Sequence, residues 1–81
     1  MTRSDLRGIL VQHLGNIAPE IDIATIDTTA DLRDECDIDS MDFLKLITAL
    51  GRELSCPMPE ADYDQMRSFD DMLGYLKTHA A

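Results

Sequence analysis

The sequence predicts an all-α fold: a small up-down helical bundle of three main helices plus one short helix, with a long loop between the first two helices. Three segments carry apolar residues at spacings of three and four, which is the period of an amphipathic helix. Prolines follow the first two of these segments and prevent the helices from continuing. One short strand-like alternation, Ile21-Asp22-Ile23, has no second strand to pair with. Because 81 residues can bury only one modest core, we expect a single domain over residues 1–81.

Residues 4–17 form the first predicted helix. Thr2, with Asp5 three residues later, resembles a capping signal, and Pro19 makes continuation of the helix unfavourable. Its apolar positions share one arc of the helical wheel: Leu6, Ile9, Leu10, His13, Leu14 and Ile17. The position of His13 on this face predicts a packed, hydrogen-bonded histidine rather than a catalyst.

Residues 18–38 show no sustained period and predict a long loop. Its isolated apolar residues are Ile21, Ile23, Ile26, Leu32 and Ile38. We expect these side chains to pin the loop to the core. A loop of this length in a compact domain is usually functional or disordered, and the regularly placed isoleucines favour a loop pinned to the core.

The second helix begins at Asp39 or Ser40, since either residue is a good N-cap. Its predicted buried face consists of Phe43, Leu44, Leu46, Ile47, Leu50 and Leu54. The helical wheel places Met41 well off this face, on the same side as Lys45, Thr48 and Arg52. Pro57 and Pro59 close the segment.

The last third of the chain predicts a short helix or turn over residues 60–66 and a final helix that begins at Ser68. Asp71 stands at the third position after Ser68, which is the form of a capping box. The buried stripe of the final helix is Phe69, Met72, Leu73 and Leu76. We interpret Tyr63, Met66 and Met72 as core residues rather than as part of a cofactor site.

The composition argues against several function classes. The chain has sixteen acidic and seven basic residues, a formal net charge of −9. Such a surface repels phosphate backbones and anionic membranes, so we expect neither nucleic acid nor a membrane as a partner. Basic protein patches are its natural complement. No apolar stretch approaches the ~20 residues of a membrane span, and no signal-peptide core follows the N-terminal residues, so we expect a cytoplasmic protein.

No combination of residues predicts catalysis or a metal site. Neither His13 nor His79 has a nucleophile and an acid nearby in sequence to complete a triad. The Asp37-x-Asp39 pattern begins like a calcium loop but lacks the required glycine. The two cysteines lack the spacing of metal ligands, and we expect two reduced thiols. We therefore expect no enzyme activity, no catalytic residue and no bound metal.

Ser40 is the residue whose chemistry is most open. It lies at the start of a strongly amphipathic helix, where a serine oxygen projects into solvent beside free backbone N–H groups. A phosphodiester attached to it would meet the positive end of the helix dipole. The alternative is that Ser40 is only the helix N-cap. The acids crowded between residues 27 and 42 form either a solvated acidic loop or, together with the outward Met41, a docking surface for basic partners.

The run Asp39-Ser40-Met41-Asp42, followed by an apolar helical stretch, resembles the Asp-Ser-Leu-Asp attachment motif of acyl carrier proteins. Length, acidity and the order of elements are also similar to that family over essentially the whole chain. The resemblance implies that the Ser40 hydroxyl receives 4′-phosphopantetheine from coenzyme A through a separate phosphopantetheinyl transferase. It also implies partner-recognition positions at Asp39, Met41, Asp42 and Lys45.

Several positions depart from the family pattern. Asp37 stands where many members have glycine. Lys45 replaces a frequent glutamate, and Arg52 adds a second positive charge on the same face, from which we hypothesise a specialised carrier with dedicated enzymes. Phe43 stands where many members have a smaller residue near the mouth of an acyl-sheltering cavity. It either narrows that cavity, which predicts weak sequestration of long chains, or simply packs in the core.

We therefore expect an acyl carrier protein that holds acyl intermediates as thioesters on the arm, in a specialised lipid or polyketide-type pathway. Its partners would be the phosphopantetheinyl transferase and acyl-activating, condensing or acyl-transfer enzymes with basic docking patches. Two alternatives stay open: an aminoacyl or peptidyl carrier with the same fold and serine, and an unmodified helical adaptor in which Ser40 is only a cap. Since no apolar stripe is left over once the helices pack, we expect a monomer.

Overall fold

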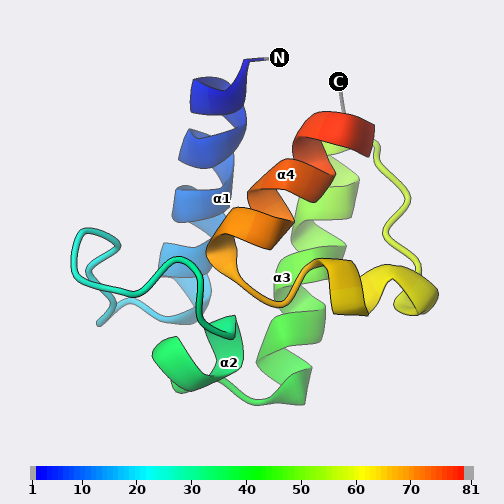
Figure 1. Ribbon diagram of the computed structural model, residues 1–81. Coiled ribbons are helices and arrows are strands. Elements are labelled where there is room, and N and C mark those ends of the chain that lie inside the picture. Colours follow the sequence, from blue (N-terminus) through cyan, green and yellow to red (C-terminus); the bar gives the residue numbers. More distant parts are fainter. Residues whose placement is uncertain (1, 80–81) are drawn as a thin grey trace.

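The computed structural model describes residues 2–79 as a helical bundle, which confirms the predicted all-α class (Figure 1). The elements in chain order are α1 (Arg3–Ile17), α2 (Leu32–Glu35), α3 (Ser40–Leu54), the 3₁₀ helix η1 (Glu60–Gln65) and α4 (Phe69–His79). Within the bundle, α3 and α4 both run back toward the end of the molecule at which α1 begins. None of the helices in this part of the chain is both long and apolar enough to cross a membrane.

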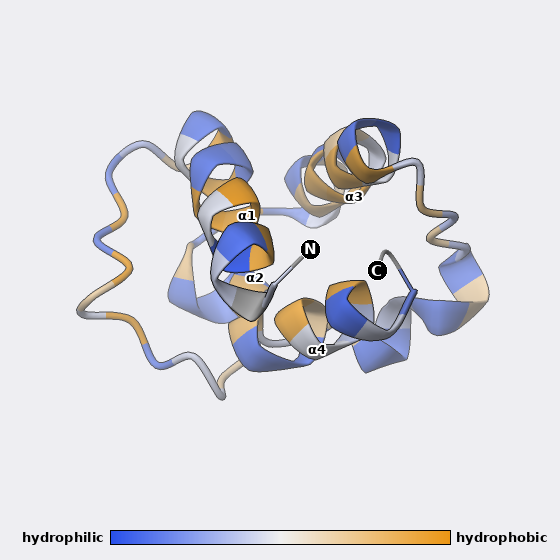
Figure 2. Ribbon diagram, turned by 90° about the horizontal axis from the view of Figure 1, so that it is seen from above, coloured by the Kyte–Doolittle hydropathy of each residue, from blue (hydrophilic) through white to orange (hydrophobic). Residues whose placement is uncertain are grey.

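The core lies between α1, α3 and α4, whose apolar faces turn toward one another (Figure 2). Packing of α1 against both α3 and α4 dominates the contacts between elements. The largest side chains that are essentially inaccessible to solvent are Leu6, Leu10, Leu14, Leu32, Leu46, Leu50, Met66, Phe69, Met72, Leu73 and Leu76. Burial of each such side chain contributes roughly 1.5–3 kcal/mol relative to exposure.

The start of α1 carries the predicted capping box. The Thr2 hydroxyl accepts a hydrogen bond from the Asp5 N–H, and the Asp5 carboxylate accepts one from the Thr2 N–H, both at 3.2 Å. The helix ends at Ile17, where the Ala18 N–H closes the last turn on the Leu14 carbonyl.

The segment between α1 and α3 is more regular than the sequence predicts, because it contains the four-residue helix α2. Asp31 caps this helix by accepting a hydrogen bond from the Arg33 N–H at 2.9 Å. A single turn is too short for the helical period to be visible in the sequence. The anchoring role of the isolated apolar residues is confirmed for Leu32 and Ile38, which are buried; Ile21 and Ile23 pack against the core and are half-buried.

Backbone and side-chain hydrogen bonds fasten this segment to the start of α4. The Leu32 N–H donates to the Arg67 carbonyl at 2.7 Å, beside an isolated antiparallel bridge between Asp31 and Ser68. Further along, the Asp70 N–H donates to the carbonyl of Thr28, whose hydroxyl donates back to the Asp70 carboxylate, both at 3.0 Å. Thus α2 has a fixed place relative to the segment that connects η1 and α4.

The last third of the chain agrees with the predicted boundaries. The Ser68 hydroxyl accepts a hydrogen bond from the Asp71 N–H at 3.0 Å and so caps α4. The hydroxyl of Tyr75, on α4, donates a hydrogen bond to the Asp62 carboxylate, on η1, at 2.7 Å. This hydrogen bond and the partial burial of the ring raise the pKa of Tyr75 to about 12. The contact holds η1 against α4.

Candidate functional site

Ser40 is the first residue of α3, and its hydroxyl is free. The N-cap is Asp39, whose Oδ1 accepts a hydrogen bond from the Asp42 N–H at 2.9 Å. The interpretation of Ser40 as the N-cap is therefore wrong. Ser40 is exposed, and its hydroxyl makes no hydrogen bond to any residue between 2 and 79. A helix start that does not need its serine leaves that serine available for covalent chemistry.

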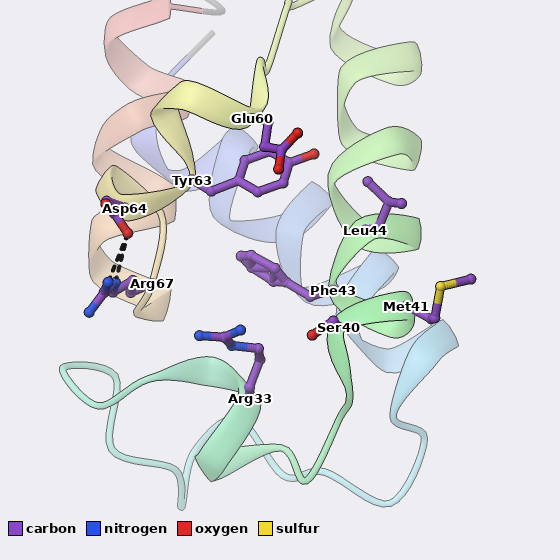
Figure 3. A pocket seen from close by; sticks show the side chains of 9 residues that line it. All are labelled: Arg33, Ser40, Met41, Phe43, Leu44, Glu60, Tyr63, Asp64 and Arg67. Atoms are coloured by element: carbon purple, nitrogen blue, oxygen red, sulfur yellow. Dashed lines mark hydrogen bonds and ion pairs between the residues drawn. The ribbon is translucent and has the colours of Figure 1, made fainter.

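A groove of about 430 Å³ opens beside Ser40, between α2, α3 and η1 (Figure 3). Its lining residues are Arg33, Ser40, Met41, Phe43, Leu44, Glu60, Tyr63, Asp64 and Arg67. The Ser40 hydroxyl turns toward the interior of the groove, whereas the Met41 side chain points away from it. A group attached to the Ser40 oxygen therefore starts at the edge of a hollow that is large enough for a flexible organic arm.

Two aromatic rings form the apolar wall of the groove. The rings of Phe43 and Tyr63 meet edge to face, with centroids 6.0 Å apart and an interplanar angle of 87°. Phe43 is buried among the core residues, and the same ring also lines the groove, so its burial is compatible with both interpretations of this residue. Tyr63 is half-buried and lines the groove, which makes it less of a core residue than its sequence position suggests.

The polar rim of the groove carries two arginines with different partners. The Arg67 guanidinium donates to Asp64 Oδ1 at 2.8 Å and 3.2 Å, a firm two-bond contact. Arg33 reaches Asp31 only at 3.4 Å and 3.5 Å, and its guanidinium lies 5.8 Å from the centroid of the Phe43 ring. Although burial raises the pKa of Asp31, hydrogen bonds from Arg33 and the two positive charges outweigh it and lower that pKa overall.

The outer face of α3 carries an exposed apolar pair. Met41 is 64% exposed, as its wheel position predicts, but Leu44 is 45% exposed and not buried as predicted. The wheel explains this correction, because Leu44 lies at ~40° when Ser40 is zero, between the buried centre near ~310° and Met41 at ~100°. Lys45 is exposed beside this pair. Methionine and leucine flanked by charges are typical of a protein-binding surface.

The other predicted recognition positions serve the start of the helix as well. Asp39 is exposed at the N-cap, and Asp42 is half-buried in the first turn, where its charge meets the positive end of α3. Asp37, just before the helix, has a backbone φ of 50°. This left-handed conformation favours glycine and disfavours an L side chain, so the aspartate at this position is strained.

His13, Cys36 and Cys56 are not among the residues that line the groove. His13 is hydrogen-bonded to the Glu53 carboxylate at 3.1 Å, as its place on α1 predicts. Cys36 and Cys56 are free and buried, and burial raises the pKa of both thiols. Among residues 2–79, no group of three or more metal-binding side chains comes together.

The sequence did not single out Arg33, Tyr63 or Arg67 as site residues. Each reaches the groove from a different segment: α2, η1 and the connection to α4. The available signal was an arginine within an acidic stretch, which is also what an ordinary solvated loop contains. Only the fold brings the three residues together.

Comparison with known proteins agrees with this arrangement. The chain matches the family model described as the phosphopantetheine attachment site over residues 5–76. It is 27% identical over 74 residues to an acyl carrier protein of Chlamydia caviae, covering 91% of this chain and 90% of that protein. It is 29% identical over 79 residues to an acyl carrier protein of Clostridium acetobutylicum, covering 98% of this chain and 96% of that protein.

Proposed function

The chain belongs to the acyl carrier protein family, whose members carry a phosphopantetheine attachment site, and from this premise we propose that Ser40 is its attachment residue. Members of this family are carriers and not catalysts, and their cofactor is 4′-phosphopantetheine. One observation supports the assignment to Ser40: because Asp39 caps the helix, the exposed Ser40 hydroxyl is free, and it faces a groove.

The residues around Ser40 fit such an arm. The attached phosphodiester would lie at the positive end of α3, where unpaired backbone N–H groups favour an anion. The groove offers the apolar surfaces of Phe43, Tyr63 and Leu44 to the uncharged remainder of the arm. When bound, the arm supplies a terminal thiol, on which a thioester keeps an acyl group activated for transfer. The protein itself positions the arm and raises the local concentration of its cargo at a docked enzyme.

We propose that partner enzymes read the outer face of α3 and the acids around its start. Met41 and Leu44 would enter an apolar hollow, while Asp39 and Asp42 would meet basic side chains on the transferase and the acyl-handling enzymes. Lys45 and Arg52 dilute the acidity of this face, because both are exposed. This supports a specialised carrier with dedicated enzymes in a lipid or polyketide-type pathway. Binding to general fatty-acid condensing enzymes as tight as that of a housekeeping carrier would contradict it.

We also propose that the protein shelters long acyl chains poorly. The Phe43 and Tyr63 rings meet edge to face between α3 and η1, and we expect them to narrow any path along which a chain would reach the core. Core methyl resonances should then hardly differ between short-chain and long-chain acyl forms. Large shifts that grow with chain length would contradict this.

Intact-mass measurement tests the attachment directly. The chain is incubated with coenzyme A, magnesium and a broad-specificity phosphopantetheinyl transferase. We expect wild type and Ser55→Ala to gain one phosphopantetheine and Ser40→Ala to gain none, with all three folded by circular dichroism. Ser55 is a matched control, because it is an exposed serine at the other end of α3. A gain by Ser40→Ala would move the attachment elsewhere.

The same samples separate the kinds of cargo. Loading of the holo protein by an acyl-activating enzyme would support acyl carriage, and loading only by an amino-acid-activating enzyme would support an aminoacyl or peptidyl carrier. Absence of any modification, with the transferase active on a control carrier, would favour an unmodified adaptor.

A further inference from the structure

We infer that Arg33 is the anion-binding residue for the phosphodiester on Ser40, and that the Phe43 ring positions its guanidinium for this role. The inference rests on the proposed attachment at Ser40. Figure 3 shows the Arg33 guanidinium beside the Phe43 ring, on the side of the groove toward which the Ser40 hydroxyl turns. Phe43 follows Ser40 by three residues on α3, so both side chains lie on neighbouring parts of the same helix face.

The backbone of Arg33 is held in place by the contacts of its two preceding residues. Arg33 belongs to α2, and the residue before it, Leu32, is buried and donates its N–H to the Arg67 carbonyl at 2.7 Å. The cap residue Asp31 pairs with Ser68 in an antiparallel bridge. A rigid mounting of this kind lowers the entropy lost when the guanidinium binds a ligand.

Arg33 has unused bonding capacity. Its Nε and Nη2 reach Asp31 at 3.5 Å and 3.4 Å, beyond the usual range of strong charged hydrogen bonds, and its side chain is 47% exposed. Its Nη1 has no hydrogen-bond partner among the residues that the structure describes. Arg67 lines the same groove, but its Nε and Nη2 are already taken by Asp64 at 3.2 Å and 2.8 Å. Of the two arginines, Arg33 has the longer existing contacts and is the one that lies beside the Phe43 ring, on the side of the groove toward which the Ser40 hydroxyl turns.

The negative charges around Ser40 explain why a cationic side chain would help to bind the phosphodiester. A phosphodiester is negatively charged at any physiological pH, and Ser40 lies between Asp39 and Asp42 in a chain with a net charge of −9. Repulsion from these acids opposes the attraction of the helix end, and a cation beside the groove would offset this repulsion. Guanidinium suits phosphate oxygens because it presents parallel N–H donors, and it makes cation–π contacts with aromatic rings, as Arg33 does with Phe43 at 5.8 Å.

Nuclear magnetic resonance of the apo and holo proteins tests the inference. The variants are Arg33→Gln, Arg33→Lys and the matched control Arg67→Gln, each loaded and verified by intact mass. On loading of wild type, we expect the Arg33 Nε–H signal to shift and its hydrogen exchange to slow by roughly 3- to 10-fold, with the Arg67 signal nearly unchanged. We expect Arg33→Gln to move the phosphorus resonance and to weaken contacts between the arm and the Phe43 and Tyr63 rings. Arg67→Gln should leave both unchanged, and Arg33→Lys should restore them in part.

The outcomes separate this inference from the proposed function. Loading at Ser40 without any change at Arg33 would overturn the inference and leave the attachment intact. The Arg33 Nε–H signal could also change only when the arm carries an acyl group with a carboxylate, and not with the free thiol or a neutral acyl group. That result would assign Arg33 to binding of the cargo and overturn its role at the phosphodiester. Absence of loading would overturn the proposed function first. Comparison of each variant in its apo and holo forms removes any effect of the lost Asp31 contact on the fold.

Discussion

Replacing Asp39 by alanine should destabilise the protein, whereas replacing its neighbour Ser40 by alanine should not. The Asp39 carboxylate caps α3 through a 2.9 Å hydrogen bond, and loss of such a cap costs about 1 kcal/mol. Its charge at the positive end of the helix contributes roughly a further 0.3–1 kcal/mol. For a domain of 81 residues, each 1 kcal/mol lowers Tm by about 4–8 °C, so Asp39→Ala should lose roughly 5–15 °C. The free hydroxyl of Ser40 predicts a change within about 0.5 kcal/mol for Ser40→Ala.

Thermal and urea unfolding followed by circular dichroism measure both effects. Asp39→Asn is the informative control, because asparagine keeps a capping oxygen but removes the charge. Its stability should fall between those of wild type and Asp39→Ala, and salt should narrow its difference from wild type. If Ser40→Ala lost as much stability as Asp39→Ala, the capping role would belong to Ser40. The reasoning that its hydroxyl is free for attachment would then be refuted.

Three further predictions concern stability. Asp37→Gly should raise the urea midpoint by the equivalent of roughly 0.5–1 kcal/mol, because φ at this residue is 50°; an unchanged or lower midpoint would argue against strain. Tyr75→Phe should destabilise by ~1 kcal/mol at neutral pH through loss of the hydrogen bond to Asp62. The fold raises the pKa of Tyr75 from 10.0 to about 12, so the stability that its protonated hydroxyl contributes is complete below about pH 10 and is lost as the pH rises toward 12. Tyr75→Phe should not show this loss of stability at alkaline pH. Parallel pH profiles for the variant and wild type would contradict the assignment. Gly8→Ala should stabilise α1 by up to ~1 kcal/mol, because the new methyl group would meet no atom within 4 Å outside the backbone of its own helix. Gly51→Ala should increase stability less, because its methyl group would lie 3.0 Å from a backbone carbonyl oxygen. Equal gains in stability would disprove this crowding at Gly51.

The long helices and their caps could be predicted from sequence because their information is local. The spacing of Leu6, Leu10 and Leu14 specifies one buried face, and the Thr2 and Asp5 pair specifies where the helix begins. The same holds for the outward position of Met41. Ser40 stood out for a related reason, since a short run of residues marks both a helix start and an attachment motif.

The groove could not be predicted, because its residues are brought together by contacts across the chain. The one-turn helix that carries Arg33 has no detectable period, and its position depends on hydrogen bonds to residues near Ser68. Leu44 was misplaced for a different reason. A helical wheel gives an angle but not the width of the neighbouring surface, and Leu44 lies at the edge of the buried face of α3, where it is 45% exposed.

The hydrogen bonds between Thr28 and Asp70 join positions that are 42 residues apart. This separation has a consequence for the order of events during folding. Ser40 is in solvent before and after α3 forms, but the hollow beside it also needs η1 and Arg67, which come from the last third of the chain. Closing a loop of that length costs entropy before its contacts are gained, so the hollow should assemble late, after α1 and α3 have paired. A ribosome-bound chain that ends before residue 60 would display the serine without the residues of η1 that line its groove.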